Sequence, residues 1–154
     1  MVLGRMTATA PAPRNALLLH ATCVQLGDTG VILLGPSGSG KSDLALRLID
    51  RGAALVADDQ TQIERIDDRL VARAAPSLAG LLEVRGVGIL KLPCCEASPL
   101  GLTVELHPEA ALPRLPDWET HDLLGVQLPL VRLDPRAASA CARIRLALAA
   151  ERVA

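Results

Sequence analysis

The chain has 154 residues, half of them hydrophobic, and its 16 Lys and Arg against 17 Asp and Glu give a formal net charge of −1. This balance excludes the strongly basic surface typical of nucleic-acid binding, and a single aromatic residue, Trp118, leaves no platform for stacking bases. No apolar run reaches the length of a membrane span, so we expect a cytoplasmic protein with no nucleic-acid or membrane partner.

The length corresponds to one domain, which we place at residues 15–154. Residues 1–14 are rich in Ala, Pro and Thr, and Pro11 and Pro13 interrupt any regular element, so this stretch predicts a flexible leader. The four cysteines show no C-x-x-C spacing, which argues against a zinc site and favours reduced thiols.

Ordered structure is expected to begin near Ala16. Residues 17–26 predict one strand that carries His20, and residues 27–30 predict the turn of a hairpin. The hairpin leads into residues 31–34, a short and wholly apolar run. Such a run is typical of a strand that is buried on both faces.

The motif Gly35-Pro36-Ser37-Gly38-Ser39-Gly40-Lys41-Ser42 follows this strand and matches G-x-x-x-x-G-K-[ST] at every fixed position. Its glycines let successive backbone N–H groups point at phosphate oxygens, Lys41 adds a positive charge, and Ser42 is positioned to ligate Mg2+. Residues 43–51 are rich in helix formers, and Gly52 is placed to end the helix. The motif thus lies between a strand and a helix, so we predict that it binds ATP with Mg2+.

Residues 53–57 form another apolar run, which ends in Asp58 and Asp59. In phosphate-loop proteins, an acid at the end of a neighbouring buried strand faces the nucleotide and Mg2+. We therefore expect this pair of acids to reach the same site.

Two short strands, residues 62–66 and 69–73, flank Asp67 and Asp68 in a pattern typical of a hairpin. Turns favour Asp because its side chain hydrogen-bonds to the nearby backbone. These two acids are therefore interpreted as turn residues rather than catalytic ones.

Residues 81–90, with the sequence LLEVRGVGIL, form the second unusual stretch. Glu83 and Arg85 are two residues apart and so lie on one face of an extended segment. Gly86 and Gly88 would permit the close approach of another group to the backbone.

The last part of the chain predicts two strands and a helix. Residues 102–106 alternate as a strand, and residues 128–133 are read as an edge strand because Pro129 would not fit a central one. Asp134 and Pro135 are expected to begin a packing helix as N-cap and first residue.

These residues alone leave three functions open: an ATP-dependent phosphotransferase, a switch-type NTPase, or a regulatory nucleotide-binding module. A GTPase would carry a guanine-reading N-K-x-D, which is absent from the sequence. A small-molecule kinase usually has an arginine-rich lid, whereas here only scattered arginines occur, in the predicted hairpin.

Four segments, in this order, resemble the catalytic domain of the HPr kinase/phosphorylase family. Enzymes of this family phosphorylate a serine of the phosphocarrier HPr and also remove that phosphate again. They are His20 before the loop, the loop 35–42, residues 55–59, and residues 82–89, similar to the family signature E-[IV]-R-G-[LV]-G-[IL]. The resemblance covers residues 14–150. It implies an α/β fold, with a P-loop sheet and flanking helices, related to that of phosphoenolpyruvate carboxykinase.

The resemblance also implies residue roles. Lys41 and the loop amides would hold the phosphates of ATP, Ser42 and Glu83 would hold Mg2+, and Asp59 would accept the proton of the substrate hydroxyl. His20 would be an auxiliary catalytic residue. For Asp58, a direct catalytic role and a structural or metal-supporting role both stay open.

The implied function is a protein-serine kinase that acts on an HPr-like phosphocarrier and assembles as a homo-oligomer, a hexamer in the family. The alternative is a non-catalytic or small-molecule-directed P-loop module that regulates a partner. The 154 residues contain no counterpart of the family's usual N-terminal domain, so we expect the short form found in some proteobacteria. Leu123 stands where the family typically has a catalytic arginine. Residues 131–136 depart from P-V-R-P-G-R, the family motif tied to dephosphorylation. We therefore expect weak phosphorylase activity.

Overall fold

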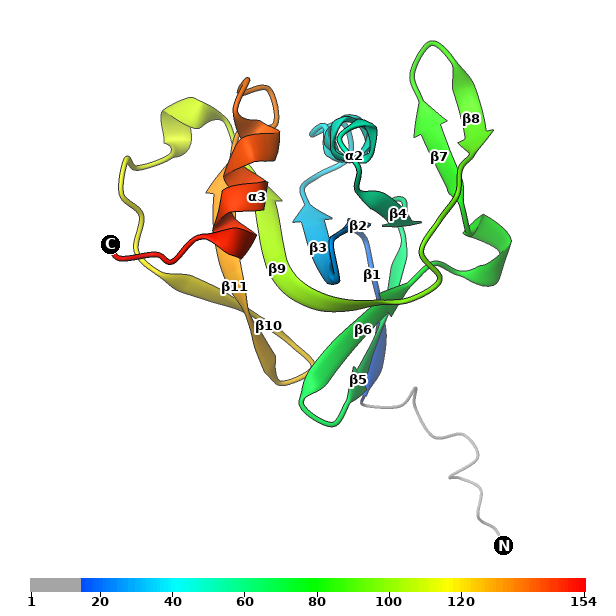
Figure 1. Ribbon diagram of the computed structural model, residues 1–154, viewed down its shortest axis with the longest axis horizontal. Helices are drawn as coiled ribbons and strands as arrows, with labels where there is room; N and C mark the ends of the chain where they lie inside the picture. Colours follow the sequence, from blue (N-terminus) through cyan, green and yellow to red (C-terminus); the bar gives the residue numbers. More distant parts are fainter. Residues whose placement is uncertain (1–14) are drawn as a thin grey trace, which may run out of the picture.

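The computed structural model describes residues 15–154, and the leader predicted at residues 1–14 lies outside the described residues. In the described residues, three strands precede helix α2, and eight more strands separate α2 from helix α3 (Figure 1). Their bounds are β1 (Ala16–Leu19), β2 (Thr22–Leu26), β3 (Thr29–Leu34), α2 (Lys41–Asp50), β4 (Ala54–Ala57), β5 (Thr61–Ile66), β6 (Arg69–Arg73), β7 (Leu81–Val84), β8 (Gly88–Lys91), β9 (Ser98–Leu106), β10 (Glu119–Leu123), β11 (Val126–Leu133) and α3 (Ala140–Ala149). Short 3-10 turns lie at Pro76–Leu78 and Glu109–Ala111.

Nine of the strands form one sheet in the order β1-β5-β6-β9-β3-β2-β4, with β11 also paired to β9 and β10 paired to β11. The long strand β9 pairs with β6 through its first residues and with β3 and β11 through the rest. It bends along its length, so the sheet curls around it (Figure 1). The predicted α/β fold with a P-loop sheet and flanking helices is confirmed.

The direction of the strands places the candidate site. Both β3 and β4 run antiparallel to β2, which lies between them, so β3 and β4 point the same way. Their carboxyl ends therefore meet at one edge of the sheet, although the two strands are not direct neighbours.

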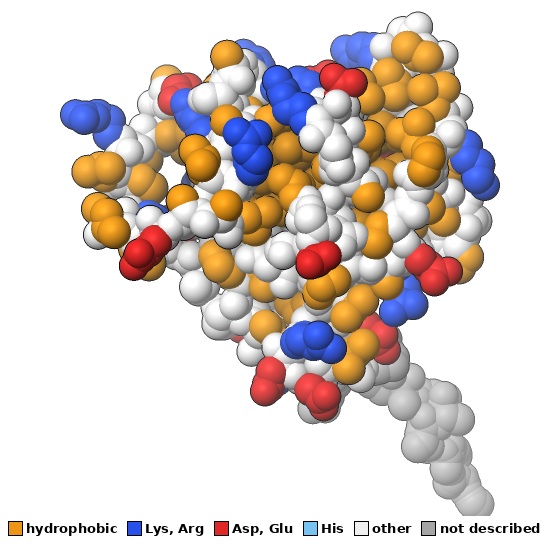
Figure 2. All heavy atoms as spheres, viewed as in Figure 1, with side chains coloured by type: hydrophobic (Ala, Val, Ile, Leu, Met, Phe, Trp, Pro, Cys, Tyr) orange, Lys and Arg blue, Asp and Glu red, His pale blue; other side chains and the backbone are white. Residues whose placement is uncertain are grey.

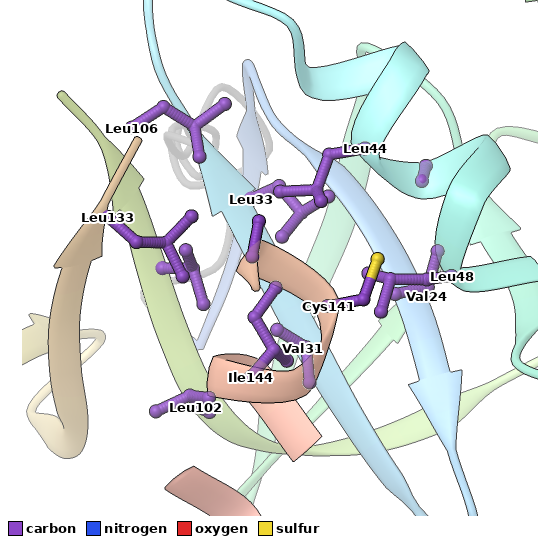
Figure 3. Packing of buried hydrophobic residues seen from close by; sticks show 13 residues of the cluster. Val24, Val31, Leu33, Leu44, Leu48, Leu102, Leu106, Leu133, Cys141 and Ile144 are labelled. Carbon is purple, nitrogen blue, oxygen red and sulfur yellow. The ribbon is translucent and has the colours of Figure 1, made fainter. Parts of the chain in front are cut away.

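Apolar clusters cover both faces of the central strands, as the alternation along β3 requires. Val31 and Leu33 point into the cluster beneath α2 and α3, whereas Ile32 belongs to the cluster on the other face. Figure 3 shows residues of β2, β3, β9, β11 and both helices meeting in the first cluster. With no Phe or Tyr in the chain, branched aliphatic side chains make up most of this core.

Ile144 is the central contact of α3 with this core and is fully buried. We expect Ile144→Ala to lower the free energy of unfolding by about 2–5 kcal/mol, because the deleted methyl groups leave a cavity. Leu146 lies on the same helix but is 56% exposed, so Leu146→Ala should change stability by about 0.5 kcal/mol or less. Urea denaturation followed by circular dichroism measures both, and equal losses would contradict this packing.

Strands β7 and β8 form a separate two-stranded hairpin that projects from the sheet (Figure 1). Leu82 is fully buried, and shortly after β8 the Cys95 N–H donates to the Leu55 carbonyl of β4 at 2.7 Å. An isolated hairpin is marginally stable in water, so these anchors at its base hold it against the rest of the domain.

Three sequence predictions need correction. The strand predicted at 17–26 is two strands, because β1 pairs with β5 whereas β2 pairs with β3 and β4, and the chain changes direction at His20. Strand β11 is not an edge strand but lies between β10 and β9. Pro129 is tolerated because the pairing with β9 begins one residue later, at Leu130.

The third correction concerns the start of the last helix. Asp134 does not cap α3, which begins at Ala140 with Ser139 as its N-cap residue. Instead its carboxylate accepts hydrogen bonds from the N–H groups of Arg136 and Glu109, at 2.8 and 2.9 Å. The guanidinium of Arg136, which donates to this carboxylate, and then these backbone hydrogen bonds lower the pKa of Asp134 to about 2. Asp134 therefore ties the loop after β11 to the turn after β9.

The residues after α3 return to the segment before β10. The Arg152 guanidinium lies 4.7 Å from the ring centre of Trp118 and donates to the Pro116 carbonyl at 2.9 Å. Within residues 15–154, no helix is both long and apolar enough to cross a membrane.

Candidate functional site

A pocket of about 520 Å³ opens where β3, β4 and β7 end beside the N-terminus of α2. Three segments distant in the sequence form it: the phosphate-loop motif with the start of α2, the acid pair after β4, and the end of β7 with its turn. The lining residues are Ser37, Gly38, Gly40, Lys41, Ser42, Asp43, Leu46, Asp58, Asp59, Glu83, Val84 and Arg85.

The loop follows β3 directly and delivers its lysine to the first position of α2. Gly40 is the N-cap residue with a φ of 103°, a left-handed conformation that favours glycine. Lys41 is only 7% exposed, and its ammonium group donates to the carbonyls of Gly35 and Pro36, at 2.6 and 3.1 Å. The buried charge is thus held by the carbonyl groups of its own loop.

The loop retains donors that suit an anion. No side chain caps the N-terminus of α2, so its first N–H groups stay available, and the helix dipole favours negative charge there. The Ser39 hydroxyl is buried and has no hydrogen-bond partner in the described part of the chain. The Ser39 side chain packs over Gly35 and does not line the pocket, so a phosphate group would be bound by the N–H groups at the start of α2. These N–H groups fit the ligand that the motif predicts.

The acid pair after β4 is fixed by two hydroxyl groups. Asp58 accepts hydrogen bonds from Ser42 Oγ at 2.7 Å and from Thr22 Oγ1 at 3.1 Å. The Thr22 hydroxyl in turn accepts the N–H of Asp59 at 3.1 Å. Asp58 therefore contacts the side chain predicted to ligate Mg2+, and this contact favours the metal-supporting role over direct catalysis.

Sequence reasoning missed Thr22, which is fully buried and positions both acids. Its neighbour Cys23 lies opposite Ala57 in the pairing of β2 with β4, which brings Thr22 to the end of β4. The sequence predicted only the hairpin of β2 with β3. Recognising β2 as the partner of β4 would have identified this threonine.

Asp59 is exposed and adopts a φ of 66°. Few residues other than glycine tolerate this left-handed conformation, and Asp is among those that do. Its carboxylate makes no hydrogen bond or ion pair with any other residue in the 15–154 range. It is therefore free to accept a proton from a group that enters the pocket.

Glu83 and Arg85 reach the pocket from the end of β7 and the turn after it, as their shared face predicts. Both side chains are exposed, and among the described residues the Arg85 guanidinium has no acidic partner. Within the same range, no three His, Cys, Asp or Glu side chains are gathered closely enough to hold a metal. Mg2+ is usually bound through one or two carboxylates plus phosphates and water, a requirement that Ser42 and the acids fit.

Two predicted positions lie elsewhere. His20 is exposed in the bend between β1 and β2 and does not line the pocket. Leu123 is 5% exposed at the end of β10, within the apolar cluster on the face away from α2 and α3. This location does not fit the interpretation of Leu123 as a substitute for a catalytic arginine.

The two arginines of the 131–136 segment are both engaged by acids. Arg132 ion-pairs with Glu105, at 2.8 Å, and with Glu119, while Arg136 pairs with Asp134 at 3.3 Å. Hydrogen bonds from His107 and Arg132 lower the pKa of Glu105. Residues 131–136 nevertheless lie next to the phosphate loop.

Two contacts show this proximity. A Cβ at Gly40 would lie 3.3 Å from Pro135, and the Arg47 guanidinium of α2 donates to the Pro135 carbonyl. The loop after β11 therefore packs against the back of the phosphate loop.

The fold and the motif define this chain as a phosphate-loop α/β domain. The model of the HPr serine kinase C-terminal domain family matches residues 12–150, nearly the whole chain. The chain belongs to that family.

Relatives and a solved structure agree with this assignment. An HPr kinase/phosphorylase from Burkholderia lata is 38% identical over 133 residues, 79% of this chain and 41% of the relative. One from Clostridium tetani is 35% identical over 111 residues, 70% of this chain and 36% of the relative. The Hpr(Ser) kinase/phosphatase from Coxiella burnetii matches with a TM-score of 0.75 and 24% identity, covering 86% of this chain and 87% of that one. The chain thus spans about two fifths or less of the curated relatives' length and shares the fold of the Coxiella protein.

Proposed function

We propose that this protein is an ATP-dependent protein-serine kinase that phosphorylates an HPr-like phosphocarrier in the cytoplasm. One observation carries the proposal: the phosphate loop, the acid pair and the signature glutamate, which are distant in the sequence, line a single pocket. A site of this size with convergent polar groups suits a nucleotide. The family relationship supplies the class of substrate.

The phosphates of ATP would be held by the loop. Lys41 would exchange its two carbonyl acceptors for phosphate oxygens, which make stronger, charge-assisted hydrogen bonds. The free N–H groups at the start of α2 would bind further oxygens. Arg85, from the turn after β7, would offset the charge that spreads over the transferring phosphoryl group.

Ser42, Asp58 and Glu83 are the residues that would hold Mg2+. In that position a bound Mg2+ would supply positive charge that offsets the charge developing on the phosphates. Asp58 already orients the Ser42 hydroxyl, so the serine and its acid reach the site as a preformed pair.

Asp59 would serve as the base. As the substrate serine oxygen forms its bond to the γ-phosphorus and the bond to the β-phosphate oxygen breaks, the Asp59 carboxylate would take the hydroxyl proton. Its exposure and its lack of partners in residues 15–154 support this role. The Thr22 hydrogen bond to its backbone N–H would hold it in place.

Other parts of the family's behaviour stay predictions. His20 would act only if the bound substrate brought the reacting groups toward the bend that carries it. Phosphate-dependent removal of the phosphoryl group would be slower than the forward reaction, because Arg132 and Arg136 already pair with acids. We also expect a homo-oligomer, with the hexamer of the family as the first candidate.

The test is direct phosphorylation. Incubation with ATP, Mg2+ and the HPr-type proteins of the source organism should add one phosphoryl group to a single serine, detected by mass spectrometry. A phosphocarrier whose serine is replaced by alanine is the matched control and should stay unmodified. Omission of Mg2+ should abolish the reaction.

The opposite result has a defined meaning. If calorimetry shows that ATP binds but no phosphocarrier or other added protein is modified, the kinase proposal is wrong. The nucleotide-sensing module described above would then be the better description.

A further inference from the structure

A second pocket, of about 330 Å³, lies at the other end of helix α2. Three elements form it: the C-terminal end of α2 with the residues after it, the turn between β2 and β3, and one face of α3. The lining residues are Leu26, Gly27, Leu48, Arg51, Gly52, Ala53, Cys141, Arg145, Leu148 and Ala149. None of them lines the phosphate-loop pocket.

The floor of this pocket is apolar. Leu48 and Cys141 are each 3% exposed and belong to the main core cluster, where Figure 3 shows them side by side with Val24. Leu26 and Leu148 pack partly buried against the same cluster. An apolar group that entered here would contact the outer surface of the core rather than water.

Two positive charges stand at the mouth of the pocket. Neither Arg51 nor Arg145 forms a hydrogen bond through its side chain or an ion pair with the rest of residues 15–154. Other arginines of the same helices are engaged: Arg47 by Asp43 and Arg143 by Glu109. The lining includes no acidic side chain.

The surface view is consistent with this arrangement. Figure 2 shows hydrophobic side chains at the surface between α3 and α2, with Lys or Arg side chains beside them. Unpaired arginines are common on solvated surfaces. Here, however, two of them stand at the mouth of an apolar pocket whose lining contains no acid. This combination suits a molecule with an apolar body and a negatively charged head.

We propose that this pocket binds a small organic anion, with the apolar body between α2 and α3 and the carboxylate or phosphate head on Arg51 and Arg145. The site is separate from the phosphate loop and does not rest on the proposed kinase activity. Its volume lies at the lower end of the range of ligand pockets, so a short aliphatic chain rather than a long lipid fits it.

Octanoate is a suitable first probe, and methyl NMR of the leucines gives a site-specific readout. Titration should shift the methyl signals of Leu26, Leu48 and Leu148 in a saturable manner, while Leu46, in the phosphate-loop pocket, should stay unchanged. Octyl phosphate should act in the same way. Octanol, which lacks the charge, and inorganic phosphate, which lacks the apolar body, should bind about tenfold more weakly or not at all.

Variants at the rim test the role of the charges. Arg51→Gln and Arg145→Gln should each weaken octanoate binding by about tenfold, because each removes a charge-assisted hydrogen bond. Arg69→Gln is the matched control, since Arg69 is an exposed arginine with no ion pair among the described residues and does not line the pocket. Backbone NMR spectra of all three variants report whether the fold is retained.

Three results would overturn the proposal. They are the absence of saturable shifts with either anion, octanol binding as tightly as octanoate, and rim variants that bind as tightly as Arg69→Gln. A fourth would assign the face to a different occupant: if these methyl signals shift with protein concentration alone, the pocket is an interface between copies of this chain.

Discussion

Lys41→Ala is expected to lower the affinity for ATP with Mg2+ by about 10- to 150-fold, the effect of losing one or two charge-assisted hydrogen bonds. Lys41 is almost fully buried, and its ammonium group already lies within the loop, where it bonds to the Gly35 and Pro36 carbonyls. Binding needs only an exchange of acceptors. Little side-chain entropy is then lost when the phosphate arrives.

Isothermal titration calorimetry measures the change, and the chain offers a matched control. Lys91, the one other lysine of the sequence, is exposed on β8 and does not line the pocket. Lys91→Ala should bind ATP like the wild type. An unchanged affinity in Lys41→Ala would mean that the nucleotide does not use the loop.

Asp59→Asn should lower the rate of phosphoryl transfer by about 10²- to 10⁴-fold, the usual contribution of a general base. The affinity for ATP should stay within a factor of about two, since the Asp59 carboxylate makes no hydrogen bond or ion pair with the loop in the described residues. Asn is tolerated in the left-handed conformation at this position, so the fold should be retained. Single-turnover phosphorylation of the phosphocarrier measures the rate.

Two further variants make this test specific. Asp67→Asn is the matched control, because Asp67 also has a positive φ, of 57°, but lies in the β5–β6 turn away from the pocket. Its rate should equal that of the wild type. Asp58→Asn should instead weaken Mg2+-dependent ATP binding, because Asp58 holds the Ser42 hydroxyl. Identical behaviour of Asp58→Asn and Asp59→Asn would contradict the division of roles.

The site was largely predictable because its chemistry is local in the sequence. The phosphate loop needs a strand before it and a helix after it, and β3 and α2 occupy those places. The acid pair was placed by the rule that acids at the ends of parallel strands meet at one sheet edge. That rule succeeded although β2, which was predicted to pair with β3 alone, lies between β3 and β4.

The elements that could not be predicted depend on pairings between distant segments. The break at His20 follows from the curl of the sheet, which sends β1 to β5 and β2 to β4. No feature of residues 17–26 marks that division, since the run is apolar and extended on both sides of it. Thr22 was missed for the same reason.

Pro129 and Asp134 show the limits of local rules. Proline is excluded only from positions whose N–H is needed, and β11 places Pro129 just before its pairing with β9. Asp134 followed by proline matches the residues preferred at the N-cap and first position of a helix. Its carboxylate instead accepts a hydrogen bond from the backbone N–H of Glu109, a residue 25 positions away in the sequence.

The scarcity of aromatic side chains sets the optical properties of this molecule. Trp118 is its only aromatic side chain and therefore its only fluorophore absorbing near 280 nm. It is 62% exposed on a segment remote in sequence from the phosphate loop. Its emission should therefore report the contact with Arg152 and the detachment of the last residues of the chain. Nucleotide binding and the loss of the aliphatic core should leave that emission almost unchanged, so a fluorescence melting curve would record the fraying of one terminus rather than the unfolding of the domain.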